Sequence, residues 1–130
     1  MFIDSNIFMH AISLQGREGE RCRDFIKKIA RGEQNSTTSV RVLDEVAWLI
    51  LRGSGLEDAI ATWERIISTP NLKILDINQS VARLVPALLR QGLDPRDAIH
   101  AATMKAHGIE TILSYDKHFD SVKGIRRQAP

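Results

Sequence analysis

Two kinds of hydrophobic pattern alternate along the chain. Short apolar runs at residues 1–3, 72–77 and 111–115 are typical of buried strands. Between them, apolar residues recur every three or four positions, which predicts amphipathic helices. Because strands and helices alternate over the whole length, the pattern predicts an α/β fold with a parallel sheet and helices on both faces. We expect helices after residue 6, over 22–30, 41–52, 56–68, 79–91 and from 94 to Gly108, and a short strand of small residues over 36–40.

Polar and glycine-containing segments interrupt this pattern. Residues 15–19 are expected to form a loop, and Pro86 is expected to bend or split its helix because proline lacks a backbone donor. Residues 122–125 are typical of a final edge strand or turn, followed by a basic tail at Arg126 and Arg127. The helical positions expected to face the core are Cys22, Phe25, Ile26, Ile29, Ala30, Val42, Val46, Leu49, Ile50, Ala59, Ile60, Trp63, Ile66, Ile67, Val81, Leu84, Val85, Leu88 and Leu89.

Composition narrows the class of protein. A chain of 130 residues with 43% hydrophobic and 26% charged residues is typical of one globular domain, here residues 1–130. One cysteine, Cys22, cannot form an internal disulfide, and no secretory pattern is present, so we expect a cytoplasmic protein. No apolar run is long enough to span a bilayer. The net charge of +2 is weak evidence for a polyanionic partner.

Acidic residues lie at the ends of the last predicted helix and strand. Asp94 before Pro95 is a good helix start, since the fixed φ of proline suits the first helical position. Asp97 then falls at the third helical position, where an acid often simply offsets the helix dipole. Asp116 stands at the exit of the apolar run over 111–115. Open α/β sheets bind their ligands at such strand exits and helix starts.

Two further acids lie at comparable positions. Asp4 ends the opening apolar run, where it could also merely cap the next helix. Glu45 lies at the margin of the apolar stripe of its helix, whereas Asp44 lies about 100° further round and faces elsewhere. If these two acids converge with Asp97 and Asp116, their repulsion requires protons or a cation. Oxygen ligands select hard ions such as Mg²⁺ or Mn²⁺, and one cysteine with scattered histidines does not make a zinc site.

These motifs resemble those of the PIN-domain family. Asp4-Ser5-Asn6 is similar to the family's Asp-x-Asn opening, and Leu43-Asp44-Glu45-Val46 is similar to its helix-borne acid. Residues 97–102, and Ser114-Tyr115-Asp116 with Asp120, resemble its third and fourth acidic motifs. The resemblance extends over essentially the whole chain, and the small size resembles the VapC-type toxin branch. The three residues before Asp4 make the opening strand shorter than is usual in the family.

The resemblance implies a fold, an activity and partners. The fold would be a PIN-like three-layer α/β/α arrangement with a parallel sheet of about five strands. The activity would be that of a divalent-metal-dependent endoribonuclease, with Mg²⁺ or Mn²⁺ as cofactor and single-stranded or loop RNA as substrate. The toxin branch implies a homodimer and a cognate antitoxin of a type II toxin–antitoxin pair. Carried over residue by residue, the catalytic metal ligands would be Asp4, Glu45, Asp97 and Asp116, supported by Asn6, Ser114 and the accessory acid Asp120.

Other residues near these motifs have ordinary structural explanations. His100 is expected to be a hydrogen-bonded helix residue, with a ligand role toward Mn²⁺ as the alternative. Trp48 and Trp63 are expected in the core or at a dimer face rather than stacked on bases. The histidines expected at the surface or in packing are His10, His107 and His118. The basic residues that could contact phosphates or simply be solvated are Lys117, Lys123, Arg126 and Arg127.

Two other functions are compatible with the same motifs. One is a PIN nuclease of RNA processing that has no antitoxin, and the other is a non-catalytic PIN module that binds RNA or a protein. Two other acidic α/β classes are excluded. A response-regulator receiver needs its phosphate-accepting aspartate at a mid-chain strand end, but residues 50–60 form a glycine break and a helix. A haloacid-dehalogenase-type phosphatase needs a second aspartate where this chain has Asn6.

Overall fold

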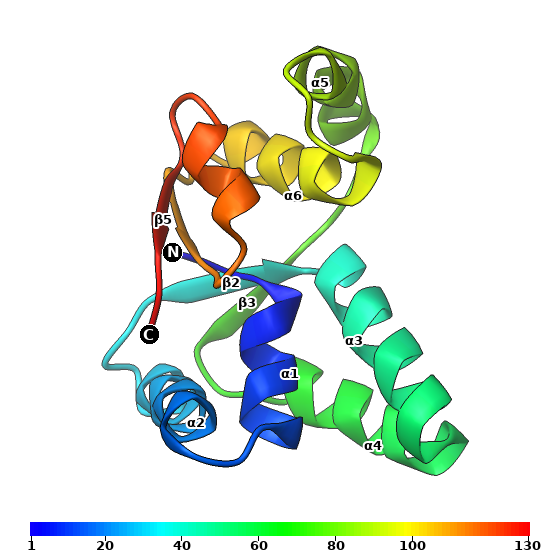
Figure 1. Cartoon of the computed structure of the whole chain (residues 1–130), viewed down its shortest axis with the longest axis vertical. Helices are drawn as coiled ribbons and strands as arrows, with labels where there is room; N and C mark the ends of the chain where they lie inside the picture. Colours follow the sequence, from blue (N-terminus) through cyan, green and yellow to red (C-terminus); the bar gives the residue numbers. More distant parts are fainter.

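A computed structural model describes residues 1–130 as a parallel sheet with helices on both sides (Figure 1). The strands are β1 (Phe2–Ile3), β2 (Ser36–Ser39), β3 (Leu72–Leu75), β4 (Thr111–Leu113) and β5 (Arg126–Gln128). The helices are α1 (Ser5–Ser13), α2 (Arg17–Ala30), α3 (Val40–Ser54), α4 (Leu56–Ile67), α5 (Gln79–Arg90) and α6 (Pro95–Ala106), with a 3₁₀ helix η1 (Lys117–Ser121).

The strand order explains why helices lie on both faces. The five strands are all parallel and are ordered β3-β2-β1-β4-β5. The chain therefore steps outward from β1 to β3 and then returns across the sheet to β4. Because crossovers between parallel strands are right-handed, a reversal of direction moves the connecting helices to the other face. In Figure 1, α1 to α4 lie on one side of the sheet, and α5 and α6 lie on the other.

The same reversal creates a crevice at one edge of the sheet. β1 and β4 are neighbours, and the crossovers leave them in opposite directions. In open α/β sheets, ligands bind outside the carboxyl ends of the strands at this switch point. Asp4 follows β1 directly, and Ser114 follows β4 directly. The topology thus brings residues more than 100 positions apart to the same crevice.

The core is built around the two central strands. Phe2 and Ile3 of β1 and Ile112 of β4 have no exposed surface, and Leu113 is 1% exposed. Central parallel strands covered on both faces consist of continuous apolar residues, as these do. The α/β class, the parallel sheet and its five strands agree with the sequence-based prediction. No helix is both long and apolar enough to cross a membrane.

Two predicted interruptions of the helices differ in the structure. Pro86 does not split α5, which continues to Arg90. Pro86 is exposed, so water can hydrate the carbonyl that its missing N–H leaves without a partner. The predicted loop over 15–19 is shorter than expected, because residues 14–16 form it and α2 begins at Arg17. Gly19 lies inside the helix, where an added Cβ would stand 2.0 Å from the Leu14 carbonyl oxygen. This glycine permits close packing and does not mark a turn.

The C-terminal strand lies later than predicted. Residues 122–125 form the turn, and β5 consists of the residues predicted as a basic tail. Val122 and Ile125 are buried and anchor the turn to the core. Arg127 turns inward and donates hydrogen bonds to both carboxylate oxygens of Asp120, at 2.7 and 3.0 Å. An edge strand pairs with only one neighbouring strand and does not require alternating apolar residues. The hydrophobic pattern therefore did not predict β5.

Several helical positions predicted to be buried are exposed. Trp48 is 51% exposed and so does not belong to the core, the first of its two predicted locations. The helices pack through a narrower stripe than the apolar pattern suggests, formed for example by Val42 and Val46 of α3. Outside these stripes, the predicted core positions that are exposed are Leu49, Ile60, Ile67, Leu84 and Leu89.

Candidate active site

Asp4 joins the end of β1 to the end of β4 through a buried hydrogen-bond network. It is the N-cap of α1, and its Oδ1 accepts a hydrogen bond from the Ser5 backbone N–H at 2.7 Å. Its Oδ2 accepts from the Asn6 amide at 2.7 Å and from the Ser114 hydroxyl at 2.5 Å. Ser114 also accepts from Asn6 at 2.9 Å and from the Asp116 backbone N–H at 2.9 Å. Asn6 and Ser114 therefore fix the position of the Asp4 carboxylate.

Burial perturbs Asp4 despite these bonds. Asp4 is 4% exposed, and burial raises the pKa of its carboxyl group. The nearby charge of His100 and the bonds from Ser114 and Ser5 oppose this increase, whereas the charge of Glu45 adds to it. The carboxylate thus lies in an environment that disfavours its negative charge.

Glu45 points inward from α3 and is paired with a buried histidine. Both carboxylate oxygens of Glu45 lie 3.1 Å from Nε2 of His100, and Arg41 Nε lies 3.3 Å from Oε1. Burial alone would raise the pKa of Glu45, but His100 and Arg41 outweigh it and hold the pKa below its usual value. Asp44 faces solvent, where it pairs with Arg41. The predicted difference in direction between Asp44 and Glu45 is therefore confirmed.

His100 has one satisfied and one orphaned ring nitrogen. The residue is 2% exposed, and its Nδ1 has no hydrogen-bond partner. Burial alone would lower the pKa of His100, but the carboxylates of Glu45, Asp4 and Asp97 raise it. The expectation of a hydrogen-bonded helix histidine is confirmed by its contact with Glu45.

Asp97 and Asp116 form a second group of acids with His118. The predicted cap at Asp94 is confirmed, since its Oδ1 accepts from the Arg96 and Asp97 backbone N–H groups at 2.8 and 3.0 Å. Asp97 is 8% exposed, and burial together with the charges of Asp94, Asp116 and Asp4 raises its pKa to about 6. His118 Nδ1 lies 3.5 Å from Asp97 Oδ2 and 3.3 Å from Asp116 Oδ1.

The four predicted acids are brought together as two linked triplets. Ligand atoms of Asp4, Glu45 and His100 lie within 4.8 Å of one another, and so do those of Asp97, Asp116 and His118. The triplets are coupled, because the charge of Asp4 contributes to the raised pKa of Asp97. The predicted acids therefore meet within each triplet, and the link observed between the triplets is electrostatic.

Two residues lie differently from expectation. His118 was expected to be a surface or packing residue, and its side chain is 75% exposed, but the ring nitrogen faces two acids. Its position two residues after Asp116, on a turn capped by the Asp116 carboxylate, was the available signal. Asp120 is exposed and pairs with Arg127 instead of joining either triplet.

The donor set fits a hard divalent cation. The four acids supply carboxylate oxygens, which Mg²⁺ and Mn²⁺ prefer. Burial makes the largest contribution to the raised pKa of Asp97, and the negative charges of Asp94, Asp116 and Asp4 add to it. A cation between Asp97 and Asp116 would supply the missing positive charge.

Similarity over nearly the whole chain identifies the protein family. The family model described as PIN domain matches residues 1–125, so the chain belongs to the PIN-domain family. Ribonuclease VapC13 of Mycobacterium tuberculosis and a VapC ribonuclease of Mycobacterium bovis are each 30% identical to it over 131 residues, covering 99% of this chain and 99% of each relative. These matches confirm the predicted family and the enzyme class, a ribonuclease.

Solved structures confirm the fold. VapC20 of Mycobacterium tuberculosis, described as a sarcin-ricin loop cleaving toxin, superposes with a TM-score of 0.77 at 19% identity, covering 99% of this chain and 98% of that chain. VapBC2 of Rickettsia felis, solved bound to a promoter DNA fragment, gives a TM-score of 0.74 at 17% identity, with coverages of 98% and 96%. A toxin–antitoxin complex from Klebsiella pneumoniae gives 0.71 at 21% identity, with coverages of 96% and 94%.

Proposed function

We propose that the chain is a divalent-metal-dependent endoribonuclease that hydrolyses RNA phosphodiester bonds in the cytoplasm, as the toxin of a type II toxin–antitoxin pair. The observation that carries the proposal is the meeting of Asp4, Glu45, Asp97 and Asp116 at the switch point of the sheet. The VapC ribonuclease relatives support RNA as the substrate.

In this proposal the four acids hold Mg²⁺ or Mn²⁺. When bound, such an ion stabilises the charge that develops on a phosphodiester and lowers the pKa of a water molecule. The chain's own residues keep the ligands in place: Asn6 and Ser114 orient Asp4, and His100 orients Glu45. Orientation of ligands by such neighbours commonly changes metal affinity by about 10–100-fold.

An antitoxin partner is supported by an exposed apolar groove. The α3–α4 groove is lined by Trp48, Leu51, Leu56, Ile60 and Trp63 and has a volume of about 440 Å³. Contiguous apolar surface of this kind on a small protein marks a protein interface. The structural relatives include toxin–antitoxin complexes, which supports an antitoxin segment as its occupant. A homodimer is also part of the proposal and is tested by analytical ultracentrifugation.

The test of the enzyme is RNA cleavage with Mg²⁺ or Mn²⁺ against an EDTA control. Asp97→Asn should abolish cleavage, whereas Asp58→Asn should cleave like the parent because this exposed carboxylate lies on α4 and belongs to neither triplet. An Asp97→Asn variant that cleaves as fast as the parent would refute the proposal. Co-purification with the product of an adjacent reading frame distinguishes a toxin from a processing nuclease, which would purify alone.

A further inference from the structure

A polar cleft opens beside Glu45, outside the two triplets of acids. Its volume is about 320 Å³, and its seven lining residues are Ser5 of α1, Arg41, Asp44, Glu45, Trp48 and Leu49 of α3, and Arg96 of α6. Small-molecule clefts range from about 300 to 1,000 Å³, so this one suits a single ring system and its attached groups. Because Glu45 belongs to both, the cleft is continuous with the acidic site.

The cleft contains one arginine that forms no salt bridge, although its charge helps to lower the pKa of Asp94. Arg96 is exposed at the second position of α6, and its guanidinium makes no ion pair. Its backbone N–H is bonded to the Asp94 cap, which fixes the start of the side chain. Arg41 also lines the cleft, but it is paired with Asp44 and Glu45. Arg96 is therefore the group that can bind an anion without first breaking an ion pair.

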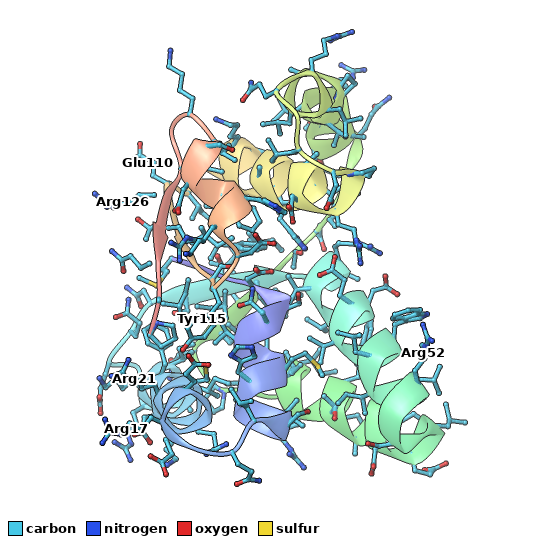
Figure 2. The ribbon with its side chains drawn as sticks, in the orientation of Figure 1. Arg17, Arg21, Arg52, Glu110, Tyr115 and Arg126 are labelled. Carbon is cyan, nitrogen blue, oxygen red and sulfur yellow. The ribbon has the colours of Figure 1, made fainter.

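The cleft also contains an exposed aromatic ring. Trp48 is 51% exposed, and the guanidinium carbon of Arg52 lies 4.6 Å from the centroid of its ring. Figure 2 shows Arg52 extending from α3 on the side away from α1. Arg41, Glu45, Trp48 and Arg52 follow one another at intervals of three or four residues, so they share one face of α3. This face carries, in order, a cation, an acid of the candidate site, an aromatic ring and a second cation.

We propose that this cleft holds the nucleotide next to the scissile phosphate of single-stranded RNA, with its base stacked on Trp48 and its phosphate bound by Arg96. The inference rests on the proposed ribonuclease function and adds a substrate subsite to it. Proteins that bind single strands combine cations along the backbone with aromatic rings on which bases stack. A base held in a duplex has no free face to offer, so the subsite selects unpaired nucleotides.

The chemistry of the cleft favours a nucleotide over a protein segment. Trp48 also borders the α3–α4 groove, whose lining is mostly apolar. The cleft differs from the groove because five of its seven lining residues are polar or charged, and it adjoins Glu45. An apolar protein segment would leave Arg96 desolvated without a partner, whereas a phosphate would bind it.

The first experiment measures binding without cleavage. The parent and its variants are titrated in EDTA with a short unstructured RNA oligonucleotide, and binding is followed by fluorescence anisotropy. Trp48→Ala is expected to weaken binding about tenfold, and Trp48→Phe is expected to retain most of it. Arg96→Ala is expected to reduce the slope of log affinity against log salt concentration by about 0.7, as for loss of one phosphate contact. Arg65→Ala, an exposed arginine of α4, is the matched control and should leave the slope unchanged.

The second experiment observes Trp48 directly. In a Trp63→Phe background, Trp48 is the only tryptophan, and stacking of a base should quench its emission when single-stranded RNA is added. A blunt duplex of the same sequence should not quench it. Circular dichroism of each variant verifies folding, and the quenching measurement needs no substitution at Trp48.

The outcomes separate this inference from the function on which it rests. Cleavage by the parent, with unchanged RNA affinity in Trp48→Ala and Arg96→Ala and no quenching, would overturn the subsite and leave the nuclease intact. Quenching by RNA without any metal-dependent cleavage would support the subsite and contradict the proposed function. Unchanged RNA affinity combined with weakened binding of an antitoxin by the same two variants would assign the cleft to the protein partner, which also overturns the subsite.

Discussion

Asp97→Asn is expected to stabilise the metal-free protein at neutral pH while removing its activity. Burial and the neighbouring carboxylates raise the pKa of Asp97 from 3.8 to about 6. A shift of this size corresponds to about 3 kcal/mol of unfavourable free energy when the group is ionised in the folded state. Asparagine has a similar shape and carries no charge, so it avoids this cost. We therefore expect a gain in the free energy of unfolding at pH 7 of up to about 3 kcal/mol.

The pH dependence of the free energy of unfolding shows independently whether ionised Asp97 destabilises the folded protein. Because the pKa of Asp97 is higher in the folded protein than in the unfolded chain, the folded state binds the proton more tightly. The destabilisation caused by the ionised Asp97 carboxylate is present above pH 6 and decreases as the pH falls toward 3.8. Between pH 7 and pH 5, the parent should gain about 1.3 kcal/mol from this residue alone. Asp4 and His100, whose pKa values are also raised, change stability in the same direction, so the difference from the variant reports Asp97 together with its effect on His100.

The assay is urea unfolding followed by circular dichroism, in EDTA at pH 5 and at pH 7. The advantage of Asp97→Asn over the parent should shrink by about 1.3 kcal/mol at the lower pH. Mn²⁺ at about 100 times its dissociation constant should stabilise the parent by about 2.7 kcal/mol and the variant much less. The reasoning fails if the variant is less stable than the parent in EDTA at pH 7 and both respond equally to pH.

Three further predictions concern neighbouring residues. Glu45→Gln should weaken Mn²⁺ binding at least about tenfold in isothermal titration calorimetry, and Asp44→Asn should bind like the parent; equal affinities for all three proteins would contradict the role of Glu45. Ser114→Ala removes a buried hydroxyl bonded to Asp4, Asn6 and the Asp116 backbone, and it should lower the free energy of unfolding in urea by about 1–3 kcal/mol; an unchanged value would show that the network contributes nothing. Asp120→Asn should leave Mn²⁺ affinity unchanged because its carboxylate binds Arg127, and a loss of affinity would restore Asp120 as an accessory ligand.

The positions of the acids at the ends of helices and strands were predictable, because the neighbouring residues in the sequence determine where each helix or strand begins and ends. Asp94 and Pro95 fix the start of α6, and this places Asp97 at its third position. The exit of an apolar run marks Asp116 in the same way. The order of the strands is not local, and hydrophobic periodicity does not encode it. The hydrophobic pattern alone therefore did not predict that Asp4 lies near Asp97. Their proximity was expected only on the assumption that the acidic motifs converge.

The contacts that the sequence did not reveal depend on side-chain direction. His118 reaches Asp97 because the short 3₁₀ helix η1 turns its ring back over the start of α6. A turn of this length is too short for a repeating hydrophobic pattern that would predict which of its side chains face the protein. His100 was expected to be hydrogen-bonded, but its partner Glu45 is 55 residues away. The pairing divides the acids into two triplets, which a list of acids along the chain does not distinguish.

The exposed apolar residues of α3 and α4 connect the two surfaces proposed here. A helix that packs on one side buries only one stripe, so an additional apolar stripe stays in water unless a partner covers it. Trp48 lies where the α3–α4 groove meets the polar cleft beside Glu45. One indole ring cannot stack on a base and also be covered by a protein segment. An antitoxin that occupies the groove would thus exclude RNA from the cleft without contacting any of the four acids.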